Sequence, residues 1–138
     1  MITLILGHKG SGKTKKLISI VNEAAETSKG NVVCIEKTPL LTYDIKSSVR
    51  LIDTDNYSIS GYDQFFAFIA GVCASDYDIT DLCVDATLRI GGRDFDDLSS
   101  FLGKVSALAE KVNVKFTFTV SCDREEIPGA VEEYATLI

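Results

Sequence analysis

The segment GHKGSGKT, which begins at Gly7, constrains the fold of this chain more than any other feature of its sequence. It stands between a short apolar run, ITLIL, and a stretch with helical spacing, KKLISIVNEAA. Gly7, Gly10 and Gly12 allow a curl of backbone N–H groups around one anion at the start of a helix. Lys13 is then predicted to reach the β- and γ-phosphates of a nucleotide, and Thr14 to bind magnesium. The alternative is a glycine-rich turn before an ordinary helix.

The remaining loop residues and the first helical positions are candidates for the same site. His8 and Lys9 occupy the variable part of the pattern, where a side chain either touches phosphate or a partner, or points into solvent. Lys15 and Lys16 follow the motif and are expected on a solvated helix face. The predicted nucleotide-binding segment comprises Gly7, His8, Lys9, Gly10, Ser11, Gly12, Lys13, Thr14 and Lys15.

Apolar, β-branched runs alternate along the chain with segments of helical periodicity. This alternation predicts an α/β fold of three layers with a mainly parallel central sheet, because parallel strands are joined by crossover helices. The predicted strands are 1–6, 31–36, 48–53, 79–85 and 115–121; the predicted helices cover 17–25 with a stop at Gly30, 62–75, 95–112, and 129–137 after Pro128.

Length and composition fit one globular unit. With 138 residues, of which 46% are hydrophobic and 25% charged, residues 1–138 are predicted to form a single domain. The four cysteines are far apart in sequence and are expected to be core thiols in a reducing compartment, which favours a cytoplasmic location. The N-terminal apolar run is too short for a signal or a membrane span. The net charge of −6 makes general nucleic-acid binding unlikely.

A second chemically informative element is LCVD, an apolar run that ends in Asp85. A buried strand ending in aspartate supplies the carboxylate that orients magnesium in phosphate-transferring proteins. Asp85 and Thr14 are therefore the predicted magnesium ligands; the alternative is an ordinary polar strand end. Ala86 follows Asp85 where many nucleotide hydrolases have a glutamate that activates water, so a base must come from elsewhere or be missing.

Polar residues end the other predicted strands as well. Because the carboxyl ends of parallel strands form one ligand-binding rim, Glu36, Asp53 and Ser121 are expected near the phosphates. Glu36 is placed to polarise a water, Asp53 to join the magnesium shell, and Ser121 to sense the γ-phosphate. The alternative for each is a polar cap on a strand end.

These motifs resemble those of known nucleotide-binding families. Two segments are similar to the core of RecA-like P-loop ATPases. They are GHKGSGKTKKLISIVNEAAETSKGNVVCIEK and LCVDATLRIGG. That resemblance implies ATP and Mg²⁺ as ligands, with Lys13 and Glu36 as the catalytic residues. The whole chain further resembles a group of small bacterial ATP-binding proteins sometimes labelled twitching-motility ATPases, which implies nucleotide binding and little more.

Other P-loop classes fit less well. The sequence FTFTVSCDRE lacks an N-K-x-D guanine-recognition motif, which favours adenine over guanine. A thymidine kinase would be expected to show an acidic pair after the strand and a zinc-binding lasso, and the chain has neither. Arg89 and Arg93, in TLRIGGRD, are placed to stabilise a transferring phosphate in their own or a neighbouring subunit, or else are solvated loop residues.

Two classes of function remain at the level of sequence. The first is a slow, magnesium-dependent ATPase completed by self-assembly or by a protein partner. The second is a non-hydrolysing nucleotide-dependent switch whose mobile loops are 37–47 and 86–94. A small-molecule kinase is a weaker alternative, because the chain has no evident lid. Glu36 favours hydrolysis, and Ala86 favours the switch.

Overall fold

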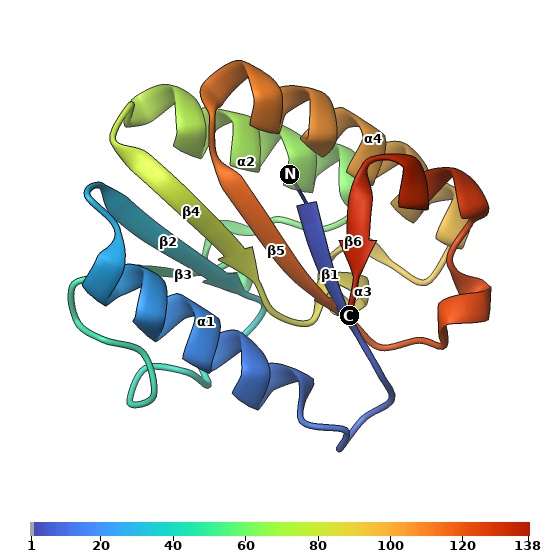
Figure 1. Ribbon diagram of the computed structural model, residues 1–138, viewed down its shortest axis with the longest axis horizontal. Helices are drawn as coiled ribbons and strands as arrows, with labels where there is room; N and C mark the ends of the chain where they lie inside the picture. Colours follow the sequence, from blue (N-terminus) through green and yellow to red (C-terminus); the bar gives the residue numbers. More distant parts are fainter. Residues whose placement is uncertain (1) are drawn as a thin grey trace.

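A computed structural model of the chain describes residues 2–138; Met1 lies outside the described residues. Six parallel strands in this part of the chain form one sheet in the order β3-β2-β4-β5-β1-β6 (Figure 1). The strands are β1 (Ile2–Leu6), β2 (Asn31–Glu36), β3 (Arg50–Asp53), β4 (Ile79–Val84), β5 (Lys115–Val120) and β6 (Ala135–Leu137).

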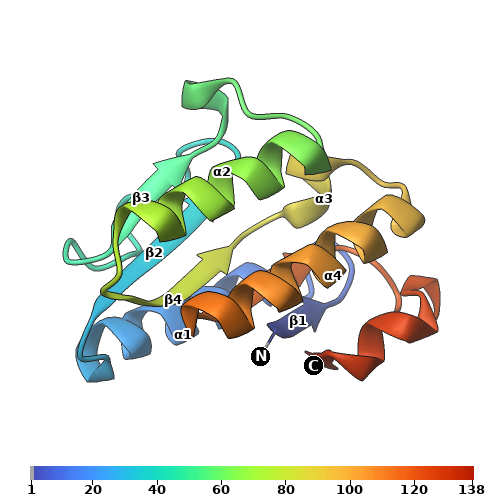
Figure 2. The ribbon, with the colours of Figure 1, turned by 90° about the horizontal axis from the view of Figure 1, so that it is seen from above.

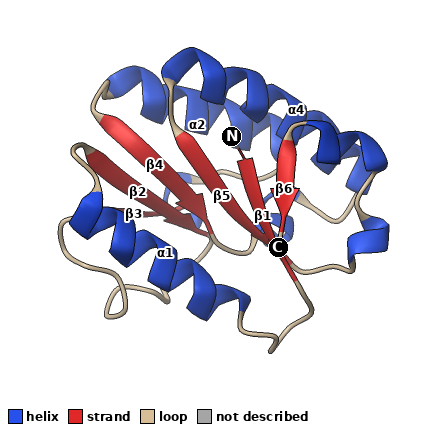
Figure 3. Cartoon of the chain, viewed as in Figure 1, coloured by secondary structure: helices blue, strands red, loops and turns tan. Residues whose placement is uncertain are grey.

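Helices cover both faces of the sheet, which gives the three predicted layers (Figures 2 and 3). The pair α2 and α4 packs on one face and α1 lies on the other. The helices are α1 (Lys13–Thr27), α2 (Tyr62–Ser75), α3 (Thr87–Gly91) and α4 (Phe95–Val112), with short 3-10 helices η1 (Asp55–Tyr57), η2 (Arg124–Glu126) and η3 (Gly129–Glu133). The predicted α/β fold with a parallel sheet is confirmed.

The alternation of side chains along β5 separates the two cores. Phe116 and Phe118 point to the α2/α4 side, where Phe101 packs edge-on against Phe118 at a centroid distance of 5.8 Å. On the opposite side, Leu17 and Val21 of α1 pack with apolar residues of β1, β2 and β4 and of the segment after β2. This central strand is buried on both faces, with its phenylalanines on one side and Thr117 and Thr119 on the other.

Most predicted elements have the expected bounds, and two local predictions are wrong. The predicted helix at 129–137 is instead the 3-10 helix η3 followed by β6, which pairs in parallel with β1. The segment 86–94, predicted as a loop, contains α3, whose Leu88 and Ile90 are buried in the core. Both elements are held by tertiary contacts that local periodicity does not record.

Gly30 follows the end of α1 as predicted, for a reason other than helix capping. The helix ends at Thr27 with Ser28 as its C-cap, and a Cβ on Gly30 would lie 2.0 Å from the Asp78 carbonyl oxygen. The glycine therefore permits a close approach between the turns that precede β2 and β4.

All four cysteines are buried and unbridged. No helix in residues 2–138 is long and apolar enough to cross a membrane.

Candidate functional site: a phosphate loop facing a carboxylate at the strand ends

The sheet order brings the predicted phosphate loop and Asp85 to one rim. Strand β5 lies between β1 and β4, with Leu6 opposite Val120 and Val84 opposite Phe118. Strands β1 and β5 therefore end level with one another, and β4 ends two residues, roughly 7 Å, short of them. Since neighbouring strands are roughly 5 Å apart, the loop after β1 and the residue after β4 are within reach of a single small ligand.

The loop between β1 and α1 depends on its glycines. Gly10 and Gly12 have φ angles of 85° and 91°, in the left-handed region that side chains disfavour. Gly7 has a φ of 148°, and a Cβ there would lie 2.4 Å from Ser11 Oγ. The backbone turns back at Ser11, whose N–H donates to the His8 carbonyl at 3.1 Å. These angles form the curled backbone expected of an anion cradle.

The first turn of α1 has neither a capping side chain nor an acidic residue of its own. Gly12, the N-cap residue, offers no side-chain hydrogen bond, and the turn carries no acidic residue. Lys13, Lys15 and Lys16 stand there instead, where the helix dipole disfavours positive charge. The Lys13 ammonium folds back to donate to the His8 carbonyl at 3.0 Å. Free N–H groups together with excess positive charge are what a bound phosphate would satisfy.

Asp85 meets the start of α1 directly. The Thr14 hydroxyl donates to both Asp85 carboxylate oxygens at 3.2 Å, across 71 residues of sequence. The Thr119 hydroxyl, 1% exposed, donates to Asp85 Oδ1 at 2.7 Å and accepts from the Ala86 N–H at 2.7 Å. Ala86 itself has a positive φ of 56°. The carboxylate is thus held in one orientation, toward the phosphate loop.

Thr119 is a site residue that the sequence prediction missed. The strand sequence FTFTV alternates aromatic and threonine side chains, and Thr117 and Thr119 are both buried on the α1 side. The available signal was a pair of hydroxyl side chains at alternate positions of an apolar strand. Buried polar groups require hydrogen-bond partners, so this pattern indicates a polar contact on that face. Sequence reasoning selected Ser121 at the strand end, whereas Thr119 makes the contact with Asp85.

Glu36 ends β2, next to the strand that carries Asp85. Its side chain is buried, and Oε1 accepts from the Leu40 and Leu41 N–H groups at 2.8 and 3.2 Å. The other oxygen, Oε2, is buried without a hydrogen-bond partner among the described residues. Burial raises the pKa of Glu36, the two N–H bonds oppose that shift, and Asp85 and Asp53 add to it. Such a carboxylate has a free acceptor and a raised proton affinity.

The other strand-end candidates lie elsewhere on the rim. Asp53 is opposite Glu36 in β3, and its Oδ1 accepts from the Asn56 N–H of η1 at 2.8 Å. With β2 between β3 and β4, Asp53 is two strands from Asp85, roughly 10 Å. Ser121 follows β5, between the phosphate loop and Asp85. The predicted contact of Asp53 with a magnesium ion at Asp85 therefore has no geometric support.

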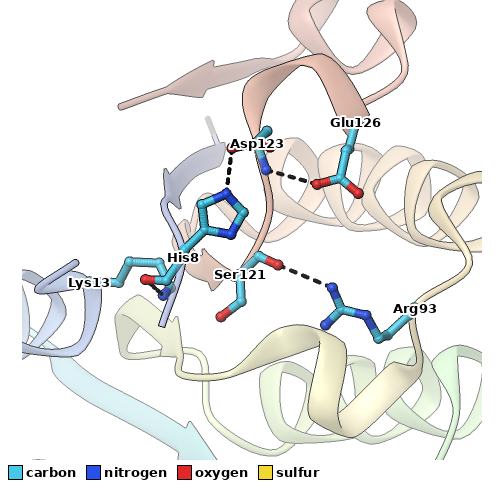
Figure 4. Close-up of polar contacts among 6 residues, drawn as sticks. All are labelled: His8, Lys13, Arg93, Ser121, Asp123 and Glu126. Carbon is cyan, nitrogen blue, oxygen red and sulfur yellow. Dashed lines mark hydrogen bonds and ion pairs between the residues drawn. The ribbon is translucent and has the colours of Figure 1, made fainter. Parts of the chain in front are cut away.

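The variable loop residue His8 contacts the segment after β5. Its Nε2 lies 2.6 Å from Asp123 Oδ1, and the Asp123 N–H donates to Glu126 Oε1 at 3.0 Å (Figure 4). Lys9 and Lys15 are exposed, as expected of solvated residues. The His8 side chain thus joins the phosphate loop to η2, a contact between residues 115 positions apart.

The donor set fits magnesium and a nucleotide phosphate. Thr14 and Asp85 offer hydroxyl and carboxylate oxygens, the hard ligands that Mg²⁺ prefers. Two protein ligands leave the rest of an octahedral shell to phosphate oxygens and water, which is how Mg²⁺ usually binds at phosphate sites. The uncapped turn of α1 and the left-handed glycines supply the matching place for the phosphates.

The fold is a three-layer α/β domain with a parallel sheet and a curled, glycine-rich loop between β1 and α1. Among solved structures, the chain is similar to a KaiC-like protein from the hyperthermophilic archaeon Pyrococcus horikoshii OT3, with a TM-score of 0.64 and 17% sequence identity. The match covers 96% of this chain and 66% of that chain. At this identity the likeness shows the fold. No family model matches the sequence, and no curated protein matches it.

Proposed function

We propose that this protein binds ATP with magnesium and hydrolyses it slowly to ADP and phosphate. The observation that carries the proposal is the contact of Thr14 with Asp85, which joins the start of α1 to the end of β4 beside an uncapped, lysine-rich helix turn. Adenine is proposed as the nucleobase of the ligand because the chain lacks the guanine-recognition motif. Magnesium would supply neutralisation of phosphate charge at the two oxygen-bearing side chains.

The residues then have distinct roles. Backbone N–H groups of the loop and the Lys13 ammonium bind the phosphates, and Thr14 with Asp85 holds the metal end of the nucleotide. Glu36 is the proposed general base, because its buried Oε2 has no partner and its raised pKa favours accepting a proton from water. The Leu40 and Leu41 N–H groups fix the carboxylate through Oε1.

The broader assignment is part of the same proposal. Residues 1–138 are proposed to act as one nucleotide-binding domain, akin to small bacterial ATP-binding proteins. Four unbridged thiols fit a reducing compartment such as the cytoplasm. Self-association or an unidentified protein partner is proposed to raise the activity. Nothing in the comparisons supports a role in twitching motility.

Hydrolysis is tested with Glu36→Gln and Lys13→Ala, assayed at high protein concentration so that any self-association is included. The glutamine keeps an acceptor for the Leu40 and Leu41 N–H groups but cannot act as a base. We expect Glu36→Gln to retain nucleotide binding and to lose about 10²- to 10⁴-fold in rate. Wild-type turnover no higher than that of Lys13→Ala would contradict the ATPase assignment.

A nucleotide-dependent switch is the second candidate, and one contact favours it. Glu36 Oε1 holds the turn at Leu40 and Leu41, where Leu41 is buried under α1 and Leu40 is 70% exposed. Movement of Glu36 toward a phosphate-bound water would therefore change the support of an exposed apolar segment. Nucleotide binding without hydrolysis, accompanied by different proteolysis of residues 37–47 in ATP and ADP, would favour this candidate over the ATPase.

A further inference from the structure

The position of Arg93 relative to the strand ends separates it from the other arginines of the chain. Its Nη2 donates to the Ser121 carbonyl at 3.5 Å, and Ser121 follows β5, the strand between the phosphate loop and Asp85. In Figure 4, Ser121 lies between Lys13 on one side and Arg93 on the other. The guanidinium therefore stands at the rim where the terminal phosphate of a bound nucleotide would lie.

Arg93 is an arginine without a salt bridge in the described part of the chain. No carboxylate of residues 2–138 forms an ion pair with it, although the chain contains 20 acidic residues. Arg124, by contrast, pairs with Glu132 at 2.6 Å. Only one donor of the Arg93 guanidinium has a described acceptor, and that bond is long. Its remaining donors are available to an anionic ligand.

The backbone that carries Arg93 is anchored on both sides. Before it, the Tyr62 hydroxyl donates to the Gly92 carbonyl at 2.7 Å, and the Tyr62 ring packs so closely on Gly91 that a Cβ there would lie 2.0 Å from it. After it, Asp94 caps α4. The Arg93 side chain is thus exposed while its backbone is held in place. This lowers the entropic cost of ordering the side chain when it binds a ligand.

The titration of Cys122 agrees with this placement. Burial raises the pKa of the Cys122 thiol to about 11, with Glu126 and Asp123 adding to the shift, while Arg93 and Lys13 oppose it. Both cations therefore lie within electrostatic range of one buried thiol beside Ser121, as do the carboxylates of Glu126 and Asp123.

We infer that Arg93 contacts the terminal phosphate of a nucleotide bound to its own chain. The inference rests on the proposed nucleotide site and adds a residue that distinguishes ATP from ADP. With planar, bidentate geometry, the guanidinium binds oxygens of the γ-phosphate opposite Lys13 and stabilises charge that spreads over them during transfer. The fold of a single chain places Arg93 and the phosphate loop at the same rim of the sheet, so this contribution does not require self-association.

The first test measures the affinity of ADP and of a non-hydrolysable ATP analogue by calorimetry. Arg93→Ala should weaken binding of the analogue by about 10- to 100-fold, the range of a charge-assisted hydrogen bond, while ADP binding changes less than about threefold. Arg93→Lys should recover part of the loss, because it keeps the charge without the planar fork. The matched control is Arg89→Ala, which removes an exposed arginine of α3 and should change neither affinity.

The second test separates action within one chain from action between chains. Arg93→Ala should lower the hydrolysis rate by at least about 10²-fold, and mixing it with Lys13→Ala should not restore activity. Restoration of activity on mixing would show that the arginine comes from a neighbour and would overturn the inference. Equal behaviour of Arg93→Ala and Arg89→Ala would also overturn it.

Failure of the inference and failure of the proposed function have different signatures. If wild-type protein binds ADP and the analogue, and Arg93→Ala leaves their ratio unchanged, only the role of Arg93 is wrong. If wild-type protein binds neither, the nucleotide site itself is wrong. Because Arg93 is exposed, its variants are expected to keep the wild-type melting temperature, which circular dichroism checks directly.

Discussion

The first turns of α1 and α4 differ in whether the protein itself provides partners for their free backbone N–H groups. At α4, Asp94 accepts from the Asp96 and Asp97 N–H groups at 2.9 and 3.0 Å, and two further acids lie in the turn. At α1, Gly12 provides no cap and lysines stand where acids are favoured. One helix start is satisfied within the protein. The other has no capping side chain, as the proposed binding of phosphate at this turn requires.

The same contrast extends along the rim of the sheet. Asp53 accepts a hydrogen bond from the Asn56 N–H, whereas Glu36 keeps one buried oxygen without a partner among residues 2–138. A buried polar atom without a partner costs free energy, and under the proposed function Glu36 keeps that oxygen for a water. The predictions below contrast groups that stabilise the fold with groups that serve the ligand.

The largest effect is expected for Lys13→Ala. Its ammonium contacts only the His8 carbonyl within the described chain, so its removal should leave the free energy of unfolding within about 0.5 kcal/mol of wild type. ADP affinity should fall by at least about 100-fold, or roughly 2.7 kcal/mol. Calorimetry and urea unfolding measure the two quantities. Lys16→Ala, in the same turn, is the control, and an equal loss of affinity there would break the comparison.

The opposite pattern is expected for Asp94→Ala. Loss of the N-cap should lower the free energy of unfolding by about 1 kcal/mol, while ADP affinity stays within about threefold of wild type. Asp96→Ala, in the same turn, keeps the cap and should cost less than about 0.5 kcal/mol. If Asp94→Ala weakened ADP binding as strongly as Lys13→Ala, the two helix starts would not have the separate roles assigned to them.

A smaller, pH-dependent effect is expected for Glu36→Gln. The folded-state pKa of Glu36 is raised, chiefly by burial, so its contribution to stability is complete below the unfolded pKa and is lost as pH rises through the folded value. The melting temperature of the variant should therefore increase relative to wild type as the pH is raised from about 4, near the unfolded pKa of a glutamate.

Glu26→Gln provides a control of opposite sign for this pH series. A hydrogen bond from Lys46 lowers the pKa of Glu26, so wild type should gain relative to that variant as pH rises through the acidic range. A melting-temperature difference for Glu36→Gln that did not change with pH would mean that its carboxylate is not held in the unfavourable setting described above.

Much of the fold was predictable because long buried elements leave strong patterns. The bounds of α2 and α4, and the ends of β2 and β3, agree with periodicity and with polar strand ends. Strand β6 was missed because three residues, Ala135–Leu137, carry no period, and pairing with β1 alone makes them a strand. The helix α3 was missed because its five residues are also too few to show a helical period.

The candidate site was predictable where backbone chemistry dictates the sequence. Three glycines and Lys13 in one short segment have few other uses, and the observed φ angles of the glycines agree with that interpretation. Thr119 was missed because a threonine in a strand is ordinary, and only the fold places its hydroxyl against Asp85. The choice between Arg89 and Arg93 likewise depended on the contact with Ser121.

The central claim is that Thr14 and Asp85 form the metal end of a nucleotide site. The most direct measurement is the calorimetric titration of ADP into wild type and Asp85→Asn, each with excess Mg²⁺ and with chelator. Wild type is predicted to bind ADP more tightly with Mg²⁺, whereas Asp85→Asn, which keeps an acceptor for Thr14 but loses the charge, should bind with little dependence on the metal. An equal gain from Mg²⁺ in both proteins, or no binding by wild type, would contradict the account.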